Sequence, residues 1–165
     1  MPDVEERFQA LVGGLDYPMY IVTVAADDRR AGCLVGFGTQ SSIDPPRYWI
    51  CISKQNHTYR VARRADALAV HVLDRGHREL ARLFGEETGD EVDKFSRCDW
   101  HPGPDGVTPV LSDCPRWFLG RLVDRVDSGD HESFLLEPVA SSSDQAHEAQ
   151  LGFQSLKDLE PGHPA

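Results

Sequence analysis

Residues 30–60 constrain the fold more than any other stretch, because they describe a strand, a turn, a second strand and the start of a helix in one run. The first strand, residues 33–39, carries two glycines among its apolar residues. Glycine weakens a strand interior and often marks the close approach of a ligand or of another backbone. An Asp-Pro-Pro turn follows at residues 44–46, and residues 48–52 form a short apolar run that suits a buried strand. The glycines also have an ordinary explanation, since they can relieve the curvature of a barrel strand.

Polar side chains gather at the entrance of the helix that follows this second strand: Ser53, Lys54, Asn56, His57 and Thr58. Hydroxyls, an ammonium group and the free backbone N–H groups of a helix start together favour anion binding. An ordinary N-cap by Ser53 or Asn56 explains the same cluster. Both interpretations can hold, because a cap donor can also face a ligand. A flat apolar ligand with a phosphate tail would suit this surface.

The charge of the chain narrows its partners. The formal net charge is −10 over 165 residues, and the pI is about 5.0. Such an acidic chain repels nucleic acid and anionic membranes, so we expect neither as a partner. The sequence has neither an apolar run of about 18 residues nor a basic-then-apolar leader. We therefore expect a soluble protein without a signal peptide.

The reactive side chains form no recognised metal or nucleophile motif. The cysteines are scattered without a C-x-x-C pair, at Cys33, Cys51, Cys98 and Cys114. In a chain of this length that pattern favours free thiols in a reducing cytoplasm. The histidines and cysteines lack metal-ligand spacing on one element, and no G-x-S-x-G or H-E-x-x-H motif is present. We therefore expect a cytoplasmic protein without a metal site.

Periodicity predicts the remaining elements. The apolar residues among positions 4–15 fall on one helical face. Helices are expected to begin near residues 56, 74 and 88, and further strands at residues 17–25, 68–73, 116–126 and 133–140. Strands joined by short helices predict a mainly β fold, an antiparallel barrel with helical caps. We assign residues 1–143 to this domain, and residues 144–165 to a polar tail that is disordered or holds a short helix.

The stretch AGCLVGFGTQSSIDPP, followed by ICISKQNHT, resembles the short-chain flavin reductase family, the FMN-binding split β-barrels. Two later motifs fit the same resemblance: Val92-Asp93-Lys94-Phe95, and Gly129-Asp130-His131 with Phe134. The resemblance spans roughly residues 17–140 and rests on the order and spacing of these motifs. It implies an antiparallel split β-barrel with a few flanking α-helices, and a homodimer.

The resemblance also implies which residues contact the cofactor. In similar proteins the backbone of the first strand runs along the isoalloxazine ring, which places Leu34, Val35, Gly36 and Phe37 at the flavin. This sequence departs from the family pattern there, because Gly36 and Phe37 stand where members often have two serines, and Leu34 stands where threonine is frequent. The polar contacts must then come mostly from backbone groups, or the cofactor is held differently.

Three further groups of residues take roles from the resemblance. The turn at residues 53–58 is expected to hold the flavin phosphate, so its polar residues Ser53, Lys54, Asn56, His57 and Thr58 are cofactor-binding candidates. Lys94 and Phe95 are expected near the flavin edge, although Phe95 could be plain core. His131 is expected beside the nicotinamide and flavin rings as the catalytic candidate, although a lone histidine after a hairpin is usually structural or solvent-facing.

The function implied is NAD(P)H-dependent reduction of FMN or FAD, after which the reduced flavin can pass to a partner monooxygenase. Hydride passes from NADH or NADPH to the flavin, so the protein mainly supplies alignment and electrostatic stabilisation. One alternative is a flavin-holding electron-transfer module without efficient NAD(P)H oxidation. Pro18-Met19-Tyr20 motivates it, because the family often reads Pro-Thr-Gly-Val there, and Tyr20 could narrow the nicotinamide pocket or stack on a ring. A second alternative is a structural barrel without a ligand.

Overall fold

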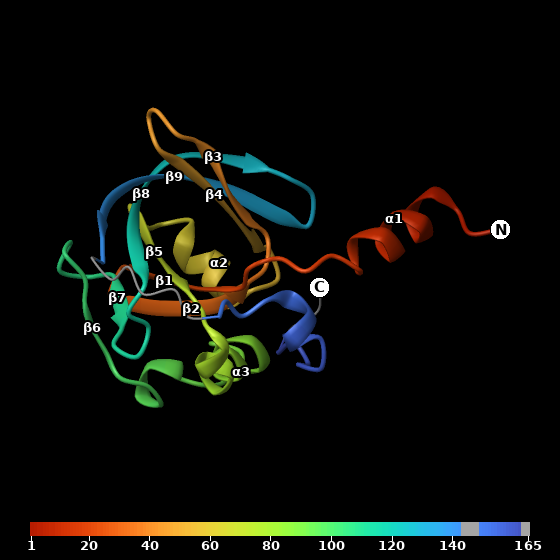
Figure 1. The fold of residues 1–165 in the computed structure, drawn as a ribbon. Coiled ribbons are helices and arrows are strands. Elements are labelled where there is room, and N and C mark those ends of the chain that lie inside the picture. The colour runs from red at the N-terminus through yellow and green to blue at the C-terminus, as the bar shows by residue number, and fades with distance from the viewer. Residues whose placement is uncertain (143–148, 163–165) are drawn as a thin grey trace.

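Seven antiparallel strands form one curled sheet in the order β2-β1-β5-β8-β9-β4-β3 (Figure 1). The computed structural model describes residues 1–142 and 149–162. The strands of the sheet are β1 (Tyr20–Ala26), β2 (Arg29–Val35), β3 (Gly38–Ser42), β4 (Arg47–Ser53), β5 (Ala67–Val72), β8 (Trp117–Asp127) and β9 (His131–Ser141). A separate two-stranded ribbon pairs β6 (Trp100–Pro102) with β7 (Pro109–Leu111). The mainly β split barrel expected from the sequence is confirmed.

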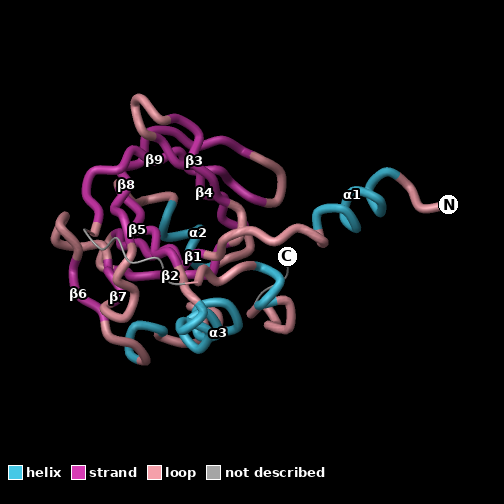
Figure 2. The backbone as a smooth tube through the Cα atoms, viewed as in Figure 1, coloured by secondary structure: helices cyan, strands magenta, loops and turns pink. Residues whose placement is uncertain are grey.

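Helices are few: α2 lies within the curl of the sheet, whereas α1 and α3 lie outside it, as Figure 2 shows. The α-helices are α1 (Val4–Val12), α2 (His57–Ala62) and α3 (Arg78–Glu86), and the 3-10 helices are η1 (Arg75–His77), η2 (Lys94–Ser96) and η3 (Phe153–Leu156). The prediction of a helix that begins near residue 88 is wrong. Residues 88–92 form a turn there, in which the Val92 N–H donates to the Thr88 carbonyl at 2.9 Å, and only the short η2 follows. Within the described residues, no helix is long and apolar enough to cross a membrane.

The single strand expected over residues 33–39 is in fact two strands. β2 ends at Val35 and β3 begins at Gly38, and these strands form the two edges of the sheet. The chain therefore crosses the seam of the barrel at Gly36-Phe37, a segment we call the crossover. The Cys51 N–H donates to the Phe37 carbonyl at 2.8 Å, which ties the crossover to β4. A glycine at this point suits a change of direction, because it has little preference for continuing a strand.

The barrel interior is packed with side chains from six strands of the curled sheet, β3 being the exception. Val22, Ile50, Val70, Phe134 and Leu136 are completely buried there. α2 closes one end of the barrel with Val61 and Ala62, and its first turn is capped by Asn56, whose side-chain oxygen accepts from the Thr58 N–H at 2.9 Å. The N-cap expected in this turn is therefore confirmed, and the cap fixes where α2 begins.

His71 fastens the β6–β7 ribbon to the sheet. The side chain is fully buried, its Nδ1 donates to the Ile21 carbonyl at 2.9 Å, and its Nε2 accepts from the Leu111 N–H at 3.0 Å. Burial lowers the pKa of His71 from its ordinary 6.5 to about 4. The imidazole is therefore neutral at neutral pH, and both of its nitrogens are used for structure.

Residues 149–162 pack against the barrel, although the sequence suggested a polar tail. Leu151 and Leu156 are 2% and 4% exposed, and they join a second apolar cluster with Phe84. The Leu151 N–H donates to the Leu73 carbonyl at 3.0 Å. The predicted boundary between residues 143 and 144 lies outside the described residues. The segment that follows it is thus attached by both apolar burial and backbone hydrogen bonds.

Candidate functional site

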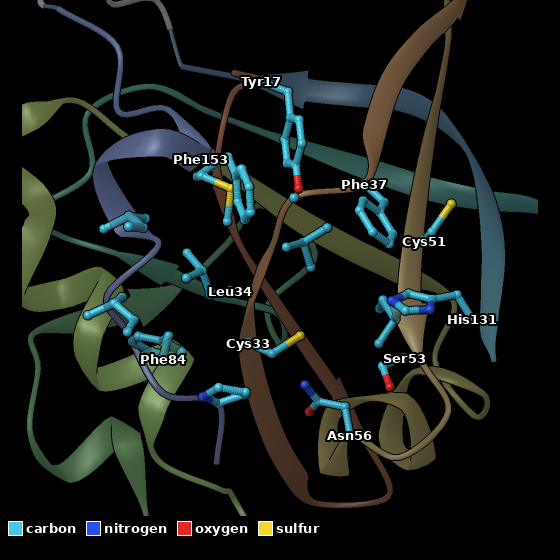
Figure 3. A pocket seen from close by; sticks show the side chains of 18 of the residues that line it. Tyr17, Cys33, Leu34, Phe37, Cys51, Ser53, Asn56, Phe84, His131 and Phe153 are labelled. Carbon is cyan, nitrogen blue, oxygen red and sulfur yellow. The ribbon is translucent and has the colours of Figure 1, made fainter. Parts of the chain in front are cut away.

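A cavity of about 390 Å³ opens at the seam of the barrel, between the crossover, α2 and the C-terminal segment (Figure 3). We call one side the near wall, which consists of Cys33, Leu34, Val35, Gly36, Phe37, Cys51, Ile52, Ser53 and Asn56. We call the opposite side the remote wall, which consists of Tyr17, Met19, Phe153, Leu156, Lys157, Leu159 and Pro161. Phe84, Gly85, Glu87 and Thr88 form the floor between them, and His131 lies at the edge.

The near wall brings together all four residues expected at the flavin ring. Leu34 and Val35 end β2, and Gly36-Phe37 form the crossover. The Phe37 side chain is 51% exposed, so its ring is available to a ligand. Because side chains alternate along β2 and the backbone then leaves the sheet, the wall presents both apolar side chains and main-chain groups to the cavity.

Polar groups of the near wall come from the start of α2. Ser53 and Asn56 line the cavity, as expected. The Ser53 hydroxyl also accepts from the Gln55 N–H at 3.3 Å. The capping role of Asn56 holds its amide in one orientation, so this part of the wall is rigid before any ligand arrives.

Three other residues of the same turn point elsewhere. Lys54 forms an ion pair with Asp127 at 2.7 Å, which raises the pKa of the lysine. His57 bonds Asp90 at 3.0 Å on the far side of the Thr88 turn, and Thr58 is buried in the barrel, 1% exposed. None of these three lines the cavity. The directions of His57 and Thr58 follow from the helix, whose successive side chains point in different directions.

Lys94 and Phe95 lie below the cavity floor, and neither lines the cavity. The buried Lys94 ammonium donates to the carbonyls of Gly32 and Phe84, at 2.9 and 3.0 Å. Burial lowers the pKa of Lys94. Phe95 packs edge-to-face on Phe84, with ring centroids 5.7 Å apart. The Lys-Phe pair therefore joins η2 to β2 and α3 from below.

His131 begins β9 at the cavity edge, opposite Ser53 in the β4–β9 ladder. Its ring contacts Phe37, with centroids 4.9 Å apart and planes at 44°. His131 Nδ1 and Asp130 Oδ1 are 2.6 Å apart, and this contact lowers the pKa of Asp130. The imidazole is thus oriented by a carboxylate on one side and by an aromatic ring on the other.

The remote wall was missed by the sequence analysis. Tyr17 stacks on Phe153, with centroids 4.7 Å apart and planes at 11°. The Phe153 N–H donates to the Tyr17 carbonyl at 2.9 Å. Only the apolar residues scattered through positions 151–159 hinted at this packing, and their spacing has no regular period.

Tyr20, which could have narrowed this cavity, lies outside it. The side chain is 4% exposed, and its hydroxyl bonds the Tyr48 hydroxyl inside the barrel. Met19 takes the place on the cavity side instead. The Pro-Met-Tyr sequence therefore changes the barrel interior more than the cavity.

Comparison with known proteins gives a consistent result. The family described as "Flavin reductase like domain" matches residues 12–157. The FMN reductase (NADH) of Bradyrhizobium diazoefficiens is 32% identical over 73% of this chain and 66% of its own. The stachydrine N-demethylase reductase subunit of Rhizobium meliloti is 28% identical over 70% of this chain and 50% of its own. The chain spans about one third to two thirds of the length of the first curated relatives it matches.

A solved structure shares the same fold. The NADH:FAD oxidoreductase of Streptomyces globisporus, in complex with NAD and FAD fragments, superimposes with a TM-score of 0.78. The two chains are 25% identical, over 92% of this chain and 89% of the other. The agreement extends to residues well beyond the motif-bearing stretch 30–60.

Proposed function

Because the chain belongs to the family of flavin reductase like domains, we propose that it reduces FMN or FAD with a reduced nicotinamide nucleotide. The observation that carries this proposal is the cavity, in which the crossover, the start of α2 and His131 meet in one place. Relatives named as an NADH-dependent FMN reductase and an NADH:FAD oxidoreductase support both flavins and favour NADH as the donor.

The cavity residues fit a flavin. The volume of about 390 Å³ is typical of sites for small ligands, and apolar and aromatic side chains dominate its lining. The glycine of the crossover lets a planar ring lie close to the backbone. Ser53, Asn56 and Thr88 supply a few polar groups, which suits the polar edge and the tail of a flavin nucleotide.

The protein contributes binding and orientation to this reaction. The bound flavin supplies the hydride acceptor, and the nicotinamide supplies the hydride. Phe37 offers a face for an aromatic ring, and His131, oriented by Asp130, offers an imidazole at the cavity edge. The stacked pair Tyr17 and Phe153 covers the opposite side.

An absorbance titration tests the proposal. FMN and FAD are added separately to the purified protein, followed by NADH or NADPH without oxygen. Binding followed by rapid bleaching of the visible flavin band supports a reductase and names its preferred flavin and donor. Absence of any spectral or fluorescence change with both flavins would refute flavin binding.

One observation favours a second candidate, a flavin-holding electron-transfer module. The Phe37 ring contacts the His131 ring and covers part of the imidazole, which would hinder the approach of a nicotinamide from that side. Flavin that binds tightly but is not bleached by either donor would support this second function.

We also propose a homodimer. The apolar face of α1 is exposed, with Val4, Phe8 and Leu11 at 73%, 58% and 66%, and the helix extends away from the barrel (Figure 1). Covering an apolar surface of this kind removes it from water, which is favourable, and the same helix of a second copy could cover it. Light scattering after gel filtration tests this, because Phe8→Glu should convert the dimer to a monomer.

A cytoplasmic location and a monooxygenase partner complete the proposal. All four cysteines are free, which suits a reducing compartment. A relative is named as the reductase subunit of an N-demethylase, which supports a role as the reductase of a separate enzyme component. Coupled assays with a flavin-dependent monooxygenase, fed only through this protein, test the delivery of reduced flavin.

A further inference from the structure

We propose that Tyr17 contacts the flavin ring and replaces the side chain that is missing at position 36. This inference rests on the proposed flavin site. It concerns a residue of the remote wall, and it explains why the crossover of this chain lacks a hydroxyl residue at Gly36.

The ring of Tyr17 occupies the space that a side chain at position 36 would need. A Cβ atom built on Gly36 would lie 2.6 Å from Cε2 of Tyr17 and 3.2 Å from Sδ of Met19. Cβ atoms almost never approach another heavy atom more closely than 3.0 Å, so either the Tyr17 ring or the backbone at position 36 would have to move. Tyr17 and a side chain at position 36 therefore exclude each other in this packing.

The ring of Tyr17 is held in place on both sides. Phe153 stacks on it in parallel, and Phe37 lies on the other side with centroids 6.2 Å apart and planes at 56°. The Phe153 N–H donates to the Tyr17 carbonyl at 2.9 Å, so the backbones are joined as well. A ring fixed in this way is already oriented for a ligand, which reduces the entropy lost on binding.

The hydroxyl of Tyr17 is directed into the cavity. Figure 3 shows the ring between Phe153 and Phe37, with its oxygen pointing inward from the remote wall. Among the described residues, no hydrogen bond to this oxygen is formed. Burial raises the pKa of Tyr17, so the phenol stays protonated at neutral pH and can donate. It therefore offers the polar edge of a flavin the kind of contact that a serine on the crossover would offer.

Four variants test the inference: Tyr17→Phe, Tyr17→Ala, Gly36→Ser, and Tyr17→Ala combined with Gly36→Ser. The first readout is the dissociation constant of FMN and FAD from fluorescence quenching, and the second is the melting temperature of the protein without flavin. Tyr59→Phe is the matched control, because Tyr59 does not line the cavity.

We expect Tyr17→Phe to weaken flavin binding about fivefold, as the loss of one hydrogen bond predicts. The melting temperature should stay unchanged, because the stack with Phe153 is kept. Gly36→Ser should weaken binding more than tenfold by displacing the Tyr17 ring. The double variant should bind better than Gly36→Ser alone, since removing Tyr17 makes room for the serine.

Two results would overturn the inference: equal flavin affinity of Tyr17→Phe and the unmodified protein, or no recovery in the double variant. Both presuppose that the unmodified protein binds flavin. If the unmodified protein binds neither FMN nor FAD, the proposed function fails, and the inference about Tyr17 fails with it. The two failures are therefore distinguished by the first titration.

Discussion

The two walls of the cavity come from differently organised parts of the chain. Every residue of the near wall lies between residues 33 and 56, whereas the remote wall joins Tyr17 and Met19 to residues 153–161, from opposite ends of the sequence. The near wall is made by two strands and a capped helix start, so its geometry is local. The remote wall exists only because the C-terminal segment returns to the barrel. A short motif can therefore specify the first wall, while the second depends on the complete fold.

The strongest test asks whether the remote wall belongs to the cooperative fold. Leu156, 4% exposed, anchors this wall in the apolar cluster with Phe84. Leu156→Ala should lower the free energy of unfolding by about 2–5 kcal/mol, as expected for a truncated core leucine. Urea unfolding measures the loss, and Val107→Ala, 59% exposed between β6 and β7, is the control with little expected effect. Unchanged stability of Leu156→Ala would mean that the remote wall does not belong to the cooperative fold.

Acid should destabilise both walls together, because both are attached to the sheet whose strand β5 carries the buried His71. The pKa of His71 is about 4 in the folded protein, and its ordinary value is 6.5. Between these two pH values the histidine is protonated in the unfolded chain but neutral in the folded protein. The contribution of His71 is complete above pH 6.5 and is lost as the pH falls toward 4. The lost stability amounts to about 3 kcal/mol, at about 1.4 kcal/mol per pH unit.

Urea unfolding between pH 7 and pH 4 measures this effect. His71→Gln should be less stable at pH 7 and should lack the part of the pH dependence that His71 supplies. If the difference between the two proteins stays constant with pH, the neutral buried histidine is not the cause. Flavin affinity measured over the same range shows whether the cavity follows the fold.

How far the sequence predicts the site also differs between the walls. The glycine crossover and the capped turn are read from neighbouring residues, and their order along the chain is enough to place Leu34, Gly36 and Asn56 together. The position of Lys94 was harder to predict. Its ammonium donates to the carbonyls of Gly32 and Phe84, which belong to two other elements. No spacing in the sequence reports such a contact.

The remote wall illustrates the same limit more sharply. Phe153 and Leu156 sit in η3, a single 3-10 turn that has no helical period and is surrounded by polar residues. The division of residues 33–39 into two strands could not be predicted either. β2 and β3 are the two edge strands of the sheet, and they meet at the seam only because the sheet curls. Local propensity cannot express either relationship.

At the edge of the near wall, His131 provides a test of catalysis separate from binding. His131→Ala should slow nicotinamide-driven flavin reduction by about tenfold, the effect of losing one hydrogen bond to the substrate. Flavin affinity should remain nearly intact, since Phe37 and the crossover remain. Stopped-flow reduction with saturating flavin measures the rate, and His101→Ala, an exposed histidine outside the cavity, serves as control. An unchanged rate would show that His131 has no role in flavin reduction.

The smallest expected effect compares one lysine near each wall. Lys54 was predicted from the sequence to bind the flavin phosphate, but its ammonium is paired with Asp127 and lies outside the cavity. Lys157 lies in the remote wall and is the cavity's single lysine or arginine among the described residues, with its ammonium 5.8 Å from the Phe153 ring centroid. In a chain with a net charge of −10, one such cation matters for an anionic ligand.

Lys157→Gln should therefore weaken FMN binding about threefold, because an exposed cation contributes modestly to holding a phosphate. Riboflavin, which lacks the phosphate, should bind both proteins equally. Lys54→Gln should alter neither ligand's affinity. Titrations with both ligands at low and high salt separate a charge effect from a packing effect, because screening removes only the former. If Lys54→Gln weakens FMN binding and Lys157→Gln does not, the phosphate lies at the near wall, and the local motif describes more of the site than the cavity suggests.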